Sequence, residues 1–114
     1  MTSRPSPENL DKIIHERARL GIVASLAARR TMTFNELKDT LDMTDGNLSV
    51  HARVLEEHGY IEIHKTFVRR KPQTTMSLTQ KGQTAFKEYL VHLEQIVSLS
   101  RSESPSAKSR KRKS

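Results

Sequence analysis

The stretch from Thr44 to Lys71 constrains the fold of this 114-residue chain more than any other. It begins with residues 45–58, where apolar side chains recur every three or four positions, as on one face of an α-helix. Gly59 follows, and glycine commonly ends a helix where the backbone turns left-handed. Residues 60–65 alternate between apolar and polar side chains, which predicts a β-strand. The stretch therefore predicts a helix, a sharp stop, a strand and a cationic end.

The residues before this stretch predict a helical scaffold. Residues 8–14 have an apolar stripe at helical spacing and predict a short helix. Residues 17–30 predict a longer helix whose wide apolar stripe indicates burial on more than one side. Thr33 and Glu36 form a capping box, which predicts that a third helix follows over residues 35–41. This third helix and the helix over residues 45–58 are expected to pack as a pair.

An antiparallel hairpin is predicted after the paired helices. Residues 74–78 alternate as residues 60–65 do, and a loop that contains Pro72 is expected to join the two strands. We expect Phe67 and Val68 to pack the hairpin onto the body. We call the loop and the adjoining strand ends, expected over residues 65–74, the wing. Its cations are Lys65, Arg69, Arg70 and Lys71.

The last helix begins after Thr79, and its apolar stripe runs from residue 85 to residue 97. A stripe of this length exceeds what a small domain can cover, so we expect it to join two copies into a two-fold dimer. The alternative is that the stripe packs onto its own core. The residues expected at the dimer interface are Leu10, Ile13, Ile14, Phe86, Tyr89, Leu90, Leu93, Ile96 and Val97.

The charge is concentrated in two places. The chain has a formal net charge of +7, yet its first hundred residues contain 14 cations and 12 anions. The excess lies from Arg101 onward and, locally, in the predicted wing. A basic patch beside an exposed helix is typical of nucleic-acid binding, and an ordinary solvated hairpin is the alternative.

Several classes of protein are not indicated by the sequence. The chain has no cysteine, which excludes disulfides and thiolate metal sites. No apolar run approaches the roughly 18 residues of a membrane span, and the N-terminus lacks a signal-peptide core, so we expect a cytoplasmic, nucleoid-associated protein. Among the five histidines, His15 and His92 with Glu88 are candidate metal ligands, but no tight ligand motif is present. We find no catalytic motif, and expect no enzyme activity, no cofactor and no metal.

The predicted architecture is mainly α-helical with a small antiparallel β-hairpin: a winged helix-turn-helix with an extended C-terminal dimerisation helix. Residues 8–98 are expected to form the single domain. Residues 1–7 contain two prolines and are expected to be a flexible arm, and residues 99–114 are expected to be a disordered basic tail.

The predicted helix over residues 45–58 has one apolar face and one face that suits a DNA groove. Leu48, Ala52 and Leu55 should be buried, which turns Asn47 and Arg53 outward. Asn47 can pair with adenine, and Arg53 can pair with guanine or hold a phosphate. The alternatives are helix capping for Asn47, an ion pair with Glu57 for Arg53, and simple packing for His51.

Four segments resemble small winged-helix regulators of the MarR and ArsR types: RLGIVASL, DGNLSVHARVLEEHGYIE, FVRRKPQTTMSLTQKGQTAF and EYLVHLEQI. The resemblance covers residues 10–96 and implies a dimeric, DNA-binding transcriptional regulator of bacterial or archaeal type. It places Asn47, Ser49, Val50 and Arg53 in the groove and Arg69, Arg70 and Lys71 on the wing. Two departures stand out: valine at positions 50 and 54, where such proteins are often basic, and Arg69 where a small residue is usual.

The main functional hypothesis is a sequence-specific regulator of double-stranded DNA, expected to repress. An effector, if any, would bind between the first helix of the domain and the last helix. The alternatives are a protein-interaction module that uses Phe67, Val68 and the 85–97 stripe, and a nonspecific architectural protein. The expected DNA-binding residues are Thr44, Gly46, Asn47, Ser49, Val50, Arg53, Lys65, Arg69, Arg70, Lys71 and Gln73.

Overall fold

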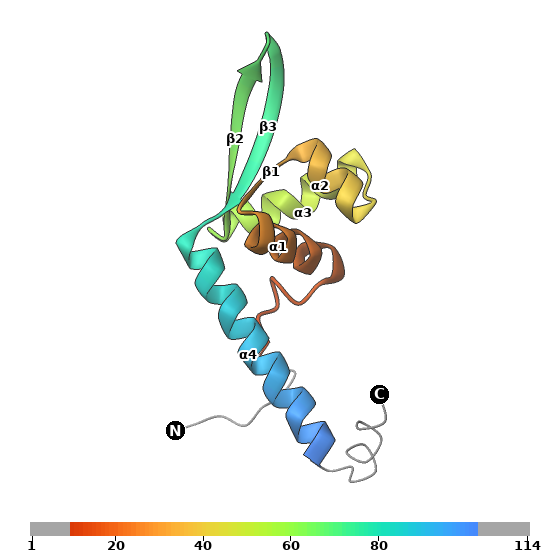
Figure 1. Cartoon of the computed structure of the whole chain (residues 1–114), viewed down its shortest axis with the longest axis vertical. Coiled ribbons are helices and arrows are strands. Elements are labelled where there is room, and N and C mark those ends of the chain that lie inside the picture. Colours follow the sequence, from red (N-terminus) through yellow and green to blue (C-terminus); the bar gives the residue numbers. More distant parts are fainter. Residues whose placement is uncertain (1–9, 103–114) are drawn as a thin grey trace.

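The computed structural model describes residues 10–102 and confirms the predicted fold class. Three short helices and a small sheet form a body, from which a hairpin projects at one end and a long helix at the other (Figure 1). The sheet is antiparallel with strand order β1-β3-β2. The elements are α1 (Arg17–Arg29), β1 (Thr31–Thr33), α2 (Phe34–Leu41), α3 (Asp45–Glu57), β2 (Ile61–Val68), β3 (Lys71–Leu78) and α4 (Gln80–Ser102).

The helices of the body begin at side chains that cap them. The Glu16 carboxylate accepts a hydrogen bond from the Arg19 amide at 2.8 Å, at the start of α1. Before α2, Thr33 and Glu36 bond each other's backbone amides, both at 3.0 Å, which confirms the predicted capping box. Before α3, the Thr44 hydroxyl accepts a hydrogen bond at 3.1 Å from the amide of the third residue of that helix. Each cap satisfies an amide that has no partner within its helix, which fixes where the helix starts.

The core lies where α1, α2 and α3 meet the inner face of the sheet. Helices α1 and α2 pack closely at Gly21, where a Cβ atom would lie 3.1 Å from Leu41 Cδ2. Burial of the apolar side chains stabilises this arrangement by about 1.5–3 kcal/mol for each large residue. The buried residues of this core are Ile22, Val23, Leu26, Met32, Leu37, Leu48, Ala52, Leu55, Ile61 and Met76.

Strand β1 was not predicted from the sequence. Its three residues pair with β3 from Thr31↔Ser77 to Thr33↔Thr75. A three-residue segment is too short to show the alternation that indicates a strand. It forms because β3 offers a second edge whose backbone groups need partners.

Residues 10–16, here called the N-terminal strap, form a turn where a helix over residues 8–14 was predicted. The prediction is wrong for residues 10–14, and residues 8 and 9 lie outside the described part of the chain. The Asp11 carboxylate accepts hydrogen bonds from the amides of Ile13 and Ile14, at 2.8 and 3.2 Å. Such side-chain bonds compete with regular helix formation.

The strap is held against the body by polar contacts. The Tyr60 hydroxyl donates to Asp11 Oδ2 at 2.6 Å, and the Tyr89 hydroxyl lies 2.8 Å from His15 Nδ1. Burial, followed by the hydrogen bond and the negative charge of Asp11, raises the pKa of Tyr60 to about 12. Tyr60 therefore remains protonated, and a donor, at neutral pH.

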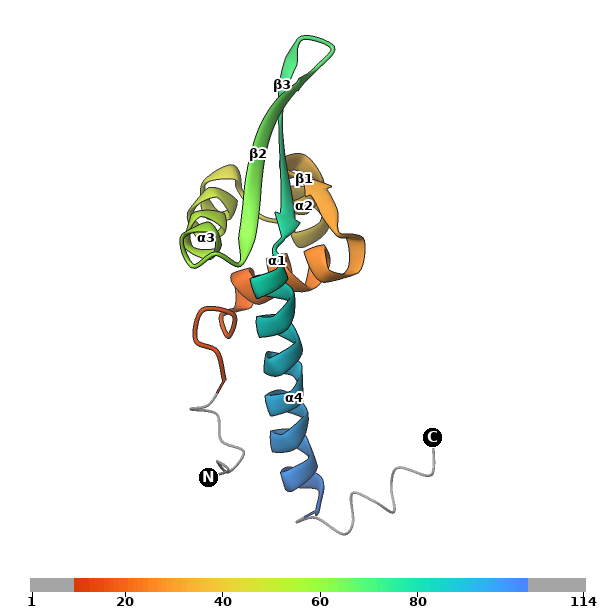
Figure 2. The ribbon, with the colours of Figure 1, turned by 90° about the vertical axis from the view of Figure 1, so that its left-hand side faces the viewer.

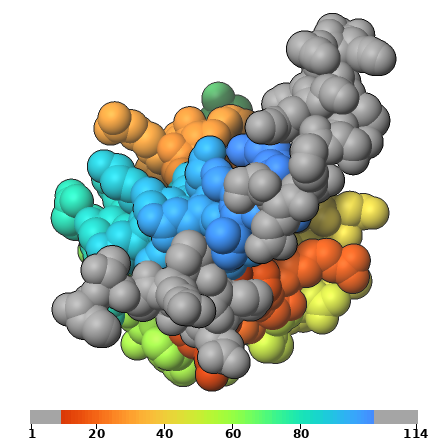
Figure 3. Space-filling model, turned by 90° about the horizontal axis from the view of Figure 1, so that it is seen from below, coloured from red at the N-terminus to blue at the C-terminus, as the bar shows by residue number. Residues whose placement is uncertain are grey.

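Helix α4 continues to Ser102, beyond the boundary expected at residue 98. Seen from its C-terminal end, it lies between the strap (red) and the end of α1 (orange; Figure 3). Three of the residues expected to join two copies, Leu10, Ile14 and Tyr89, are buried against one another within the single chain. Leu90 and Val97 are exposed, at 46% and 41%. Ile13, Phe86, Leu93 and Ile96 are partly buried in the chain's own clusters.

Four residues tie the end of α3 to the hairpin and the start of α4; we call Gly59, Tyr60, Thr79 and Gly82 the junction. The Thr79 hydroxyl donates to the Gly59 carbonyl at 2.6 Å and accepts from the Gly82 amide at 2.9 Å. The Thr79 amide donates to the Tyr60 carbonyl at 3.0 Å. Gly59 has a φ of +77°, which confirms the predicted left-handed stop. At Gly82 a Cβ atom would lie 2.1 Å from the Tyr60 carbonyl oxygen, so only glycine fits there.

We predict that Gly82→Ala lowers the free energy of unfolding by about 3 kcal/mol, because the backbone of the junction must shift to admit the methyl group. Urea denaturation measures the change. Gly46→Ala is the matched control, since a Cβ atom there would meet nothing within 4 Å apart from its chain neighbours and the backbone of its own helix. Alanine favours a helix over glycine, so the control should be as stable as the parent or more so. Equal stability of the two variants would refute the steric account of the junction.

Candidate nucleic-acid interface

Helix α3 divides into a buried and an exposed face as predicted. Leu48, Ala52 and Leu55 are at most 2% exposed and form part of the core. Val50, at 60%, is among the most exposed large apolar side chains in the described residues. The exposed residues of α3 are Asp45, Gly46, Asn47, Ser49, Val50, Arg53, Glu56 and Glu57.

The polar side chains of this exposed face are available to a ligand. Asn47 donates its backbone amide to the cap at Thr44, while its side chain makes no hydrogen bond within residues 10–102. Arg53 forms no ion pair with Glu57 in the described part of the chain, so that alternative is wrong. The Thr44 hydroxyl is engaged in the cap, which makes it a positioning group at the start of α3.

Contacts from α1 and α2 fix the position of α3. His51 is half-buried, with Nδ1 3.2 Å from Arg19 Nη1 and 3.6 Å from Glu16 Oε1, which confirms that it packs. Burial raises the pKa of Glu16, but backbone hydrogen bonds and the charges of His51 and Arg19 outweigh it, and the net pKa is lowered. Lys38 Nζ of α2 lies 2.7 Å from Asp45 Oδ1, and this hydrogen bond raises the pKa of Lys38.

The hairpin is longer and tighter than predicted. Strands β2 and β3 pair from Ile61↔Leu78 to Val68↔Lys71, so Arg69 and Arg70 alone form the turn (Figure 2). Pro72 lies within β3 opposite Phe67, and the expectation that it belongs to the loop is wrong. Proline is tolerated there because this pair does not exchange backbone hydrogen bonds and β1 ends before reaching it.

The turn places two arginines in a strained conformation. Arg69 and Arg70 have φ values of +54° and +67°. Two-residue hairpin turns with positive φ at both positions favour Asn-Gly, since a Cβ atom costs roughly 1–2 kcal/mol in this region. Strain of this kind is concentrated at functional sites. The strained turn places two adjacent guanidinium groups at the far end of the hairpin.

The inner face of the hairpin continues from the core toward the tip. Side chains alternate between the faces of a strand, so Lys65 and Phe67 share a face with the core residues Ile61 and Ile63. An open groove of about 650 Å³ separates this face from α3. Arg53 of α3 and Lys65 of β2 both line the groove, together with Glu56. The exposed face of α3 and the basic hairpin thus form one continuous surface.

The predicted DNA-binding residues lie mainly on this surface, with Arg69 and Arg70 exposed at its tip. Lys71 and Gln73 lie on the other face of the hairpin, where Lys71 is exposed and Gln73 is half-buried. Residues 63–87 contain six Lys and Arg and no Asp or Glu. Four of these cations lie on the hairpin, whose part beyond Glu62 is therefore positively charged, which suits a polyanion.

Phe67 and Val68 do not pack the hairpin onto the body, so that expectation is wrong. They are 74% and 46% exposed. The distal half of the hairpin extends past the helices, where no element of the body can cover it (Figures 1 and 2).

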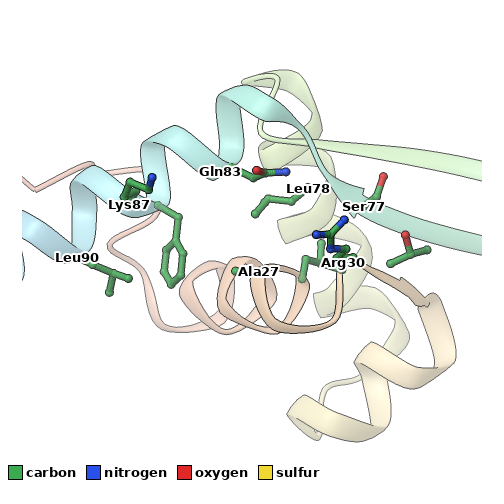
Figure 4. Close-up of a pocket in the computed structure, with 10 residues that line it drawn as sticks. Ala27, Arg30, Ser77, Leu78, Gln83, Lys87 and Leu90 are labelled. Atoms are coloured by element: carbon green, nitrogen blue, oxygen red, sulfur yellow. The ribbon is translucent and has the colours of Figure 1, made fainter.

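A second groove, of about 560 Å³, lies between the end of α1, strand β3 and α4. Ala27, Leu78 and Leu90 are among its apolar lining, with Arg30 and Lys87 at its sides (Figure 4). It lies where the sequence predicted that an effector would bind, and that prediction stays untested. Among residues 10–102, no three side chains of His, Cys, Asp or Glu gather as a metal site would require, and no helix is long and apolar enough to cross a membrane.

The order of three helices, a small sheet and a basic hairpin beside the exposed helix defines a winged helix-turn-helix. The sequence profile of the winged helix DNA-binding domain family matches residues 18–97, and the chain belongs to this family. It has the DNA-binding domain found in winged-helix transcriptional regulators. Proteins of this family are generally non-enzymatic.

Two archaeal proteins are similar to this chain in sequence, and a bacterial structure shares its fold. The uncharacterized protein MJ0432 of Methanocaldococcus jannaschii is 38% identical over 75% of this chain and 92% of its own length. The structure of a transcriptional regulator homologue from Pyrococcus horikoshii OT3 is 34% identical, with a TM-score of 0.73 over 77% of this chain and 87% of that one. A regulator of the MarR family from Enterococcus faecalis V583 shares the fold, at 22% identity and a TM-score of 0.63 over 89% and 84%.

We predict that the double variant Arg69→Asn/Arg70→Gly stabilises the hairpin, because asparagine and glycine adopt the positive φ of the two turn positions at a lower cost in free energy than arginine. Amide hydrogen exchange at Val68 and Lys71 should slow by about fivefold to thirtyfold, as 1–2 kcal/mol of local stability implies. Arg69→Ala/Arg70→Ala removes the same charges but keeps a Cβ atom at both positions. If the alanine variant slows exchange equally, charge repulsion rather than strain limits the stability of the tip.

Proposed function

We propose that this chain is a sequence-specific transcriptional regulator that binds double-stranded DNA as a homodimer. Helix α3 enters the major groove, and the turn of the hairpin contacts the flanking backbone or minor groove. Its action is repression, because a dimer bound at an operator blocks access to the same DNA. The protein acts in the cytoplasm, on the chromosome.

The observation that supports this proposal most is the shared groove between α3 and the hairpin. Arg53 and Lys65 line it from opposite sides, and Arg69 and Arg70 extend the same surface outward. Base edges are read by polar side chains on an exposed helix, while cations bind the phosphates and set the register. Asn47, Ser49 and Arg53 provide the first kind of contact, and the hairpin provides the second.

Helix α4 supports the dimer. Leu90 and Val97 are one heptad apart on one side of the helix and remain exposed in the single chain. They widen a stripe whose other members pack against the N-terminal strap. Pairing α4 across a two-fold axis would bury Leu90 and Val97 and place the two α3 helices about one turn of DNA, roughly 34 Å, apart.

Arg53→Ala and Arg70→Ala should weaken DNA binding in different ways. Duplexes selected by the parent protein from a random pool serve as probes, with binding followed by fluorescence anisotropy at several salt concentrations. Loss of a base contact at Arg53 costs about 1–3 kcal/mol and relaxes the preference at one position. Loss of a phosphate contact at Arg70 weakens binding to all sequences and lowers the salt slope by about one.

Arg29→Ala is the matched control, because Arg29 is exposed at the end of α1, away from the shared groove. It should bind DNA like the parent. The absence of any binding by the parent would contradict the proposal and favour a protein-interaction module. Tight binding with a steep salt slope and no preferred sequence would indicate a nonspecific architectural protein.

Leu90→Asp/Val97→Asp should weaken the dimer by about 30-fold or more, since charges then replace apolar contacts at the centre of the interface. Sedimentation equilibrium measures the dissociation constant. Gln95→Asp, on an exposed side of the same helix, introduces a charge without touching the stripe and should leave the dimer intact. A monomeric parent protein at micromolar concentration would rule out this dimer.

A further inference from the structure

Phe67 and Pro72 form an apolar projection near the tip of the hairpin. Phe67 is 74% exposed, more than any other large apolar side chain in the described residues. It lies directly opposite Pro72, one pair away from the two-residue turn. In such a hairpin this pair does not exchange backbone hydrogen bonds, and the side chains of such pairs approach most closely. The two rings therefore form one unit, here called the wedge.

The wedge lies on the side of the hairpin that faces the predicted DNA. Phe67 is two residues from Lys65 on β2, and Pro72 is two residues from Thr74 on β3. Lys65 and Thr74 line the groove that Arg53 borders from α3. Because side chains two residues apart share a face, the wedge continues the same surface outward. Val68, in contrast, lies on the opposite face of β2.

The surroundings of the wedge select its binding partner. Arg69 and Arg70 lie beyond it and Lys65 lies below it, with no acidic residue between positions 63 and 87. The hairpin and α4 extend from opposite ends of the body, so a partner copy on α4 would leave the wedge uncovered (Figure 1). An apolar group with cations on either side of it suits a binding partner whose apolar part is flanked by anionic groups. Stacked bases between phosphates are such a partner.

We propose that the wedge inserts at a base step in the minor groove beside the site that α3 reads, unstacking that step and kinking the duplex. This inference rests on the proposed DNA-binding function. Apolar side chains, phenylalanine and proline among them, act in this way in proteins that bend DNA from the minor groove. Pyrimidine–purine steps unstack most easily. Phe67 therefore determines specificity at a base step to which it donates no hydrogen bond.

The test uses a duplex of about 30 base pairs, selected from a random pool by the parent protein. Adenines on either side of the central site are replaced in turn by 2-aminopurine, whose fluorescence rises when its neighbours unstack. Dyes at the two ends report bending. The parent should raise the fluorescence at one flanking step and bend the duplex by about 20–90°.

Phe67→Ala should abolish both signals and weaken binding about tenfold. It should also lose the preference for TA or CA/TG at that step when the selection is repeated. Phe67→Leu keeps an apolar wedge and should retain most of the bend. Val68→Ala truncates the neighbouring residue on the opposite face and should behave like the parent. Phe67 is exposed, so urea denaturation should show that these variants fold like the parent.

The outcomes separate the wedge from the function on which it rests. If Phe67→Ala binds and bends the duplex as the parent does, the wedge is overturned and DNA binding by α3 stands. If Val68→Ala loses the bend as well, a general disturbance of the hairpin explains the result and the wedge is again overturned. If the parent selects no duplex from the pool, both the wedge and the proposed function fall.

Discussion

The hydroxyl group of Thr79 bonds the two elements on which the rest of the molecule depends. It donates to the carbonyl of Gly59, where α3 ends, and accepts from the amide of Gly82, where α4 begins. The Tyr60 carbonyl accepts from the Thr79 amide, at the base of the hairpin. Helix α3, the hairpin and helix α4 are therefore joined to one another by hydrogen bonds at the junction. The backbones of α4 and of the chain that follows α3 approach so closely at Gly82 that no side chain fits between them.

A rigid base of this kind allows the outer parts of the molecule to be locally unfavourable. The tip contains two arginines with positive φ and an exposed phenylalanine, features that lower stability and favour aggregation. Natural proteins depart from local rules of this kind mainly at functional sites. Among the described non-glycine residues with positive φ, Arg30 and Asp42 end α1 and α2, whereas Arg69 and Arg70 lie together at the tip of the hairpin, next to the surface that faces the exposed side of α3. The junction thus holds in place a hairpin whose locally unfavourable tip belongs to the surface proposed to read DNA.

What the sequence predicted correctly depends on signals between near neighbours in the chain. The capping box at Thr33, the stop at Gly59 and the apolar face of α3 each involve residues a few positions apart. The predicted helix was wrong for residues 10–14 because Asp11 bonds the amides that a helix would use, and Tyr60 holds Asp11 in place from far along the chain. Periodicity cannot show such a contact.

Other features lacked a local signal. Strand β1 has three residues and exists because β3 has an open edge. Arg69 and Arg70 are not turn residues by composition, and Pro72 suggested a loop that the paired strands do not contain. The pattern in α4 indicated burial, but it could not distinguish a partner within the chain, which covers Tyr89, from one in a second copy, proposed for Leu90 and Val97.

The central claim is that the exposed face of α3 and the hairpin form a single DNA-reading surface. Titration of the isotopically labelled protein with a selected duplex, followed by amide chemical shifts, tests it most directly. The account predicts that the largest changes fall together on residues 45–53 and 65–73, with α4 beyond residue 90 little affected. Changes confined to α4, or restricted to the cationic tip without α3, would contradict it.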